Sequence, residues 1–265
     1  MEKTIPPSSP DRRAKQAVLL WGVYILVNIV LNGTVPFALG VDLRSWTYSV
    51  TKDLLIHILV YAALFLVAPL ILTKGWQVVR QPAFLVPLLI ACATIAFRPF
   101  FRWSVALVPL VLVYLHWRFD LAELGFRSQG WKGDLGAVLI LGFMFIIPVF
   151  FQPGPYTISI LPAIATGLDR LFANPASTVE NLFYFGFLTE RLSFKTGRWL
   201  TPVLIGLMYT LHEMTNPEYW YEGMAFALVF IGVTITSSIY LWRRNVIAIW
   251  LGDGLGKLLN ALISA

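Results

Sequence analysis

The 265-residue chain has few charged residues and a single cysteine, and both shortages limit what it can be. Charged residues make up 13% of the chain, whereas a soluble domain usually carries about 25%. Hydrophobic residues make up 58%, and so much apolar surface indicates contact with lipid. Cys92 cannot form an internal disulfide, so it does not indicate a redox compartment.

The net charge of +6 does not indicate nucleic-acid binding. The basic residues lie in short clusters between apolar runs, where they orient membrane helices, so we expect no nucleic-acid partner. The apolar run that begins after residues 1–15 is too long for a signal-peptide core and lacks a small-residue cleavage site. We therefore expect a retained first span at Val18–Leu39.

Nine apolar windows bounded by charge, Gly or Pro predict an all-α, polytopic transmembrane bundle of about eight or nine spans. Residues 1–15 form a polar N-terminus, and 16–265 form a single membrane domain. The third and fourth windows are short and could instead be a helical hairpin or a tilted, partly buried pair, and eight spans is the alternative count. The windows are about 16–39, 52–72, 81–97, 101–117, 134–151, 176–194, 199–215, 221–241 and 245–263.

Two connections between the windows also have helical features. Residues 119–132 could form a short interfacial helix that ends at Gly125, and residues 152–175 could hold a half-helix at 161–172. With nine spans and a cytoplasmic N-terminus, most of the 20 basic residues lie in the inside segments, as expected for an integral membrane protein in that orientation.

Ionisable residues inside these windows are the candidates for chemistry, because each costs about 2.5 to 3.5 kcal/mol at a helix centre without a partner. Glu180, His212 and Asp253 lie in three different windows and could converge in one cavity. Asp253 could instead pair with Lys257, one turn later. Those three groups are competent metal ligands, but the zinc signature that begins at His212 and Glu213 lacks its second His. We expect no metal and no cofactor.

Three further ionisable residues have structural explanations. Glu190 precedes Arg191 and is expected at the cytoplasmic interface among cations. His116 lies beside Trp117 at a window end, where amphipathic rings settle at the headgroup level. His57 is expected to bond a neighbouring helix.

The segment ENLFYFGFL, from Glu180 to Leu188, resembles the first motif of the CPBP family of CAAX-prenyl-protease and bacteriocin-processing membrane proteins, usually E-E-L-F-F-R-G-F-L. LIGLMYTLH, ending at His212, resembles the second motif, F-x-x-x-H. The run from Asn245 to Lys257 resembles the last, H-x-x-x-N, and LAELGFRSQGWKGDL is similar to an L-G-x-R segment of the family. The resemblance covers residues 120–263.

The resemblance implies peptide-bond hydrolysis by a water that Glu180 activates and His212 assists. The departures from the motifs are Asn181 for the second Glu, Phe185 for the Arg, Met208 for the Phe, Asp253 for the second His and Lys257 for the Asn. Asp253 is the candidate auxiliary carboxylate, and Lys257, Tyr184 or Tyr209 could supply an oxyanion donor. Asn181 and Glu213 complete the auxiliary candidates.

The function predicted from the sequence is a membrane-embedded peptidase. Its partners would be the lipid bilayer and a membrane-associated peptide or protein substrate. The alternative is a catalytically degenerate CPBP-like protein that acts as a membrane binding or scaffold partner. A small transporter has less support, because the chain shows no inverted repeat. The family resemblance implies a bacterial plasma membrane.

Overall fold

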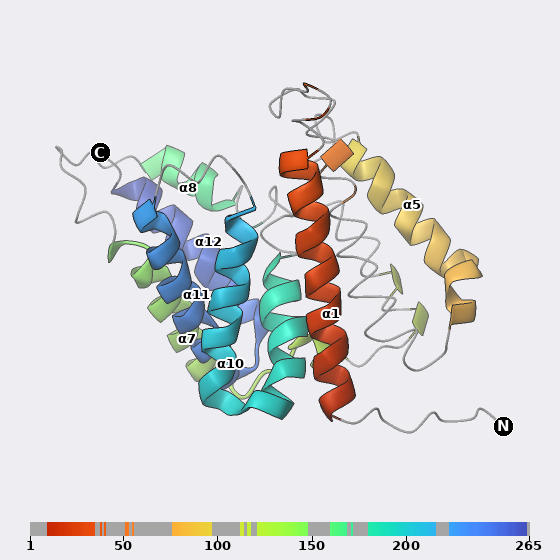
Figure 1. The fold of residues 1–265 in the computed structure, drawn as a ribbon. Coiled ribbons are helices and arrows are strands. Elements are labelled where there is room, and N and C mark those ends of the chain that lie inside the picture. The colour runs from red at the N-terminus through yellow and green to blue at the C-terminus, as the bar shows by residue number, and fades with distance from the viewer. Residues whose placement is uncertain are drawn as a thin grey trace.

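The computed structural model describes residues 10–34, 38, 40, 51–52, 55, 76–96, 112–113, 116–117, 121–147, 160–168, 171, 180–215 and 223–263. Within these ranges the chain is helical without a β-strand, apart from one isolated bridge between Phe126 and Asn245 (Figure 1). The all-α prediction is confirmed for this part of the chain. The windows 52–72 and 101–117, and with them His57, lie largely outside the described residues.

The helices follow the apolar windows. The first half contains α1 (Pro10–Ile29) with its π-helical extension η1 (Val30–Thr34), then η3 (Trp76–Arg80) and α5 (Pro82–Ala96). The second half contains η5 (Leu121–Leu124), α7 (Trp131–Met144), α8 (Ile160–Leu168), the π-helix η8 (Leu182–Leu188), α10 (Thr189–Glu213), α11 (Gly223–Arg243) and α12 (Val246–Leu262). The short helix that was predicted to end at Gly125 is η5, and Gly125 follows it with φ of 80°. The half-helix expected within 161–172 is α8.

Helix α10 consists of two limbs joined at Gly197, where φ is 71° and ψ is 175°. Only glycine adopts this backbone conformation readily. The limbs run side by side, because Tyr209 of the second limb hydrogen-bonds Glu180, which lies before the first. Figure 1 shows the two limbs meeting at the end of the bundle where α1 begins. The predicted break between windows 176–194 and 199–215 is confirmed.

Four segments meet at this end of the bundle, which we call the basic end. Lys195 Nζ lies 2.9 Å from Asp11 Oδ1, so the α10 bend touches the start of α1. The backbone N–H of Val246 donates to Gly125 O at 2.8 Å, which brings the start of α12 to the segment after η5. Helix α12 ends at the opposite end of the bundle (Figure 1).

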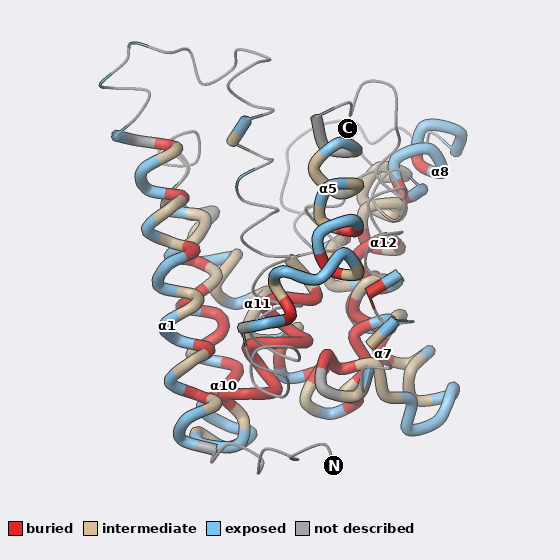
Figure 2. The backbone as a smooth tube through the Cα atoms, turned by 90° about the vertical axis from the view of Figure 1, so that its right-hand side faces the viewer, coloured by how far each residue is buried: buried red, intermediate tan, exposed pale blue. Residues whose placement is uncertain are grey.

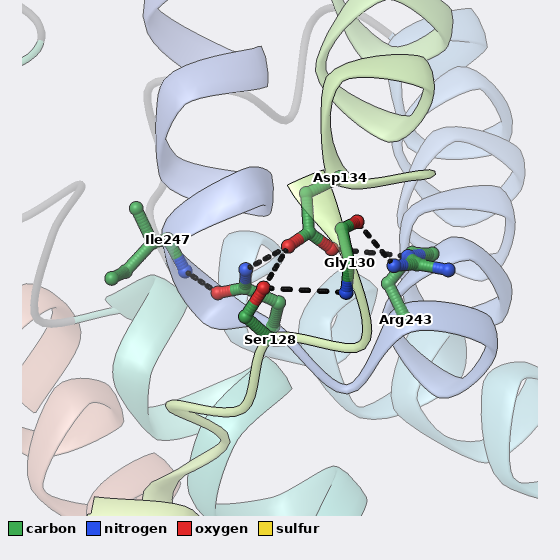
Figure 3. Close-up of polar contacts among 6 residues, drawn as sticks. Ser128, Gly130, Asp134, Arg243 and Ile247 are labelled. Carbon is green, nitrogen blue, oxygen red and sulfur yellow. Dashed lines mark hydrogen bonds and ion pairs between the residues drawn. The ribbon is translucent and has the colours of Figure 1, made fainter. Parts of the chain in front are cut away.

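A hydrogen-bonded cluster holds α7 to the turn between α11 and α12 (Figure 3). Asp134 accepts bonds from Ser128 Oγ at 2.8 Å, Arg243 Nε at 3.0 Å and Asn245 Nδ2 at 3.0 Å. Arg243 also donates to the Gly130 carbonyl at 2.9 Å. Asn245 Oδ1 accepts the N–H of Ile247 and so caps α12. These contacts fix the basic end of three helices.

Glu190 lies beside this cluster and is 3% exposed. Arg244 Nη1 and the Tyr240 hydroxyl each donate to its carboxylate, both at 2.9 Å. Glu190 thus lies beside a cation, Arg244, which directly follows α11, whereas Tyr240 lies near the end of that helix. The cytoplasmic location expected for Glu190 stays a prediction.

The exposed surface is apolar and part of the interior is polar. On α1, Tyr24 and Asn28 are buried, whereas Leu19 is 70% and Leu26 60% exposed. Figure 2 shows this alternation of buried and exposed turns along α1. By length and composition, two of the described helices could cross a membrane, at Asp11–Asn32 and Phe226–Arg243. The count of eight or nine spans stays a prediction.

Candidate functional site

His212 lies near the end of the second limb of α10 and contacts the N-terminal helix. Its Nε2 is 3.0 Å from the Tyr24 hydroxyl, and the two rings are 4.9 Å apart between centroids. Tyr24 itself is buried and packs edge-on against Phe183 of η8 at 5.3 Å. The sequence analysis missed Tyr24, because an aromatic residue in an apolar run looks like any lipid-facing or core residue.

Glu180 lies just before η8, where its carboxylate meets the second limb of α10. The Tyr209 hydroxyl donates to Glu180 Oε2 at 3.3 Å. The glutamate also interacts electrostatically with the hydroxyls of Tyr24 and Tyr184. The whole of η8 is buried, and π-helical turns of this kind occur frequently at functional sites.

Tyr184 and Tyr209 connect the two ionisable groups. The Tyr209 ring lies 4.7 Å from the Tyr184 ring and 5.8 Å from the His212 ring. The Tyr184 ring is stacked on His212 at 5.8 Å with an interplanar angle of 18°. We call Tyr24, Glu180, Tyr184, Tyr209 and His212 together the His212 cluster. It brings two of the three predicted catalytic residues and two auxiliary candidates into one region.

The other predicted site residues are placed as follows. Asp253 is buried on α12, a helix that packs against α7, α8 and η8. Lys257 Nζ lies 5.6 Å from the centroid of the Phe145 ring. Asn181 adjoins Glu180, and its buried Nδ2 has no hydrogen-bond partner among the described residues. Glu213 is the last residue of α10.

The family's cationic position is apolar in this chain. Phe185, which stands where the CPBP motif has Arg, is buried within η8. Among the residues that the structure describes, no group of three or more His, Cys, Asp or Glu side chains could hold a metal ion. Glu180, His212 and Asp253 therefore do not form a metal-ligand set. His116, outside the cluster, packs edge-on against Trp117 at 5.0 Å.

Comparison of the chain with protein-family models, with curated proteins and with solved structures found no match.

Proposed function

We propose that this chain is an integral membrane peptidase of CPBP type, which hydrolyses a peptide bond in a membrane-associated peptide or protein at the His212 cluster. One observation carries the proposal. Tyr209 contacts both Glu180 and His212, so the general base and the imidazole that the motifs imply share one region of the helical bundle. Convergent acid–base groups inside an apolar bundle mark a functional site by default.

The distribution of polarity supports the membrane part of the proposal. Exposed leucine, isoleucine and valine side chains on α1 and α11 would face lipid, while Asn28 and Ser237 are turned inward. A soluble protein would place these groups the other way round, because an exposed apolar face this large is unfavourable in water. The two helices that could span a membrane agree with this assignment.

In the proposed hydrolysis, the Glu180 carboxylate is the general base. Glu180 takes a proton from a water molecule, whose oxygen forms a bond to the carbonyl carbon of the peptide while the π electrons move to the carbonyl oxygen. The tetrahedral intermediate then collapses, the C–N bond breaks, and the proton on Glu180 passes to the leaving nitrogen. The products are a carboxyl group and an amine. Tyr209 orients the carboxylate, His212 assists without itself taking a proton, and no step uses Asp253.

The test needs no known substrate. Full-length protein, Glu180→Gln and the control Asp11→Asn would be produced in bacterial membranes, and new protein N-termini would be identified by N-terminal labelling and mass spectrometry. Asp11 is an exposed carboxylate at the basic end, far from the chemistry. We expect cleavage events that Glu180→Gln loses and Asp11→Asn keeps. Identical sets of N-termini from all three proteins would refute the peptidase.

That negative result would favour the alternative function, a catalytically degenerate CPBP-like protein. One observation also supports this alternative. Glu180 and His212 both have phenolic partners within the protein, Tyr209 and Tyr24, and Phe185 stands at the family's Arg. Such a protein would bind a membrane partner through the same fold.

A further inference from the structure

Three buried hydrogen-bonding atoms at the His212 cluster have no partner among the residues that the structure describes. They are Trp21 Nε1, the Tyr184 hydroxyl oxygen and His212 Nδ1. Leaving a buried polar atom without a hydrogen bond costs about 1 to 3 kcal/mol. Such atoms are rare enough that each calls for an explanation.

The three atoms come from elements that pack together. Helix α1 contacts both α10 and η8, and the Tyr184 ring is stacked on the His212 ring. The Trp21 side chain lies next to the Tyr184 hydroxyl. Trp21 also precedes Tyr24 by three residues, which places both on one face of α1. Tyr24 bonds His212, so this face of α1 is the one that lies toward His212.

The Tyr24 contact favours one of the two positions for the proton of a neutral His212 ring. Tyr24 is 2% exposed, so its O–H needs an acceptor in the core, and Nε2 lies 3.0 Å away. A neutral imidazole has one N–H and one acceptor nitrogen. If Tyr24 donates to Nε2, the proton of His212 is on Nδ1. His212 Nδ1–H, Trp21 Nε1–H and Tyr184 O–H are then three donors, and none of them meets an acceptor at hydrogen-bond distance within the described part of the chain.

We infer that these three groups form an oxygen-binding site, completed by the N-terminal helix, which holds a water molecule at rest and the substrate's carbonyl oxygen during hydrolysis. Tyr24 is a positioning residue that fixes the His212 tautomer. Buried donors from neighbouring segments suit an oxygen that becomes negatively charged, because fixed donors stabilise developing charge without reorganising. The assignment to a carbonyl oxygen rests on the proposed function, whereas the oxygen site itself does not.

The tautomer can be read directly. The chain has three histidines, so full-length protein with ¹⁵N-labelled histidine in a lipid bilayer gives few ring signals, and His212→Gln assigns the one of interest by its loss. We expect Nδ1 protonated and Nε2 bare in the unsubstituted protein, and a mixture of tautomers in Tyr24→Phe. A protonated Nε2 in the unsubstituted protein would overturn the inference.

The oxygen site is tested by transfer of magnetisation from water to the His212 ring in the same samples. We expect rapid transfer in the unsubstituted protein and slower transfer in Tyr184→Phe and Trp21→Phe. Tyr240→Phe is the matched control, because it removes a buried hydroxyl that bonds Glu190 at the basic end. A His212 ring that receives no magnetisation from water, or the same loss in Tyr240→Phe, would refute the site.

Cleavage separates this inference from the proposed function. If the peptidase is correct, Tyr184→Phe should reduce the Glu180-dependent cleavage about 10²-fold, the usual effect of removing one oxyanion donor, while Tyr240→Phe cleaves normally per folded molecule. Unchanged cleavage in Tyr184→Phe would overturn the carbonyl assignment. A hydrated, Nδ1-protonated His212 without any Glu180-dependent cleavage would refute the peptidase and support the oxygen site.

Discussion

Two buried charged residues, Glu190 and Arg243, have oppositely charged partners from distant segments of the chain. Glu190 is the clearest case, because its carboxylate is 3% exposed and holds both Arg244 and Tyr240. A buried pair contributes little net stability when intact, since desolvation of both ions offsets their attraction. Removing one member of the pair destabilises the fold, because the other charge stays in the protein without its counterion.

Glu190→Gln should therefore destabilise the fold without touching the His212 cluster. We expect a loss of about 2 to 4 kcal/mol, slightly below the usual range for a fully buried pair because the Arg244 side chain is 28% exposed. The measurement is the thermal unfolding midpoint in detergent, followed by tryptophan fluorescence. The double variant Glu190→Gln/Arg244→Gln should recover part of the loss, and no recovery would contradict the ion-pair explanation.

At the scale of the helix, two glycines are required for different reasons. A Cβ built on Gly186 of η8 would overlap the backbone carbonyl oxygen of Leu124, and backbone cannot move aside as a side chain can. Gly186→Ala should cost about 1 to 3 kcal/mol. Gly232 of α11 is the control, because a Cβ there would meet nothing within 4 Å. Gly232→Ala should be neutral or stabilising, and equal melting temperatures for the two variants would contradict the packing of η5 on η8.

Gly197, in contrast, is required by its backbone angles alone. A Cβ at this position would also meet nothing within 4 Å, but φ of 71° with ψ of 175° is a conformation that other residues avoid. Gly197→Ala should cost about 1 to 3 kcal/mol and lower the melting temperature relative to Gly232→Ala. A melting temperature equal to that of Gly232→Ala would mean that the two limbs of α10 do not need this bend.

These glycines show what sequence reasoning can reach. The break at Gly197 and the helix end at Gly125 can be predicted locally, because each is marked by a glycine between two apolar runs. The bond between Tyr24 and His212 joins residues 188 positions apart, and nothing local distinguishes Tyr24 from a lipid-facing tyrosine. The family resemblance begins near residue 120, so it gives no information about α1. Glu180 and His212 can be predicted from the sequence motifs. The residues that orient them can be identified only once the packing of the helices is known.

At the scale of the whole molecule, charge and chain direction together predict an orientation in the membrane. The basic end gathers most of the cations in the described part of the chain: Arg12, Arg13, Lys15, Arg127, Lys132, Lys195, Arg198, Arg243 and Arg244. Exposed tryptophans accompany them, with Arg198 lying 5.1 Å from the Trp199 ring. Positive charge is typical of the cytoplasmic face of a membrane protein, and tryptophan is typical of either membrane–water interface. The basic end is therefore expected in the cytoplasm.

The chain direction then favours nine spans over eight. Helix α1 begins at the basic end and α12 ends at the opposite one (Figure 1), so the number of crossings between them is odd if both helices cross. Alkaline phosphatase fused after Ala265 should be active outside the cytoplasmic membrane, and green fluorescent protein fused before Met1 should fluoresce inside. A phosphatase that is inactive at the C-terminus, in a fusion protein shown to be present and intact, would mean an even number of crossings. It would also require one of the two helices to stay on a single side of the bilayer, which the apolar exposed face of α1 makes costly.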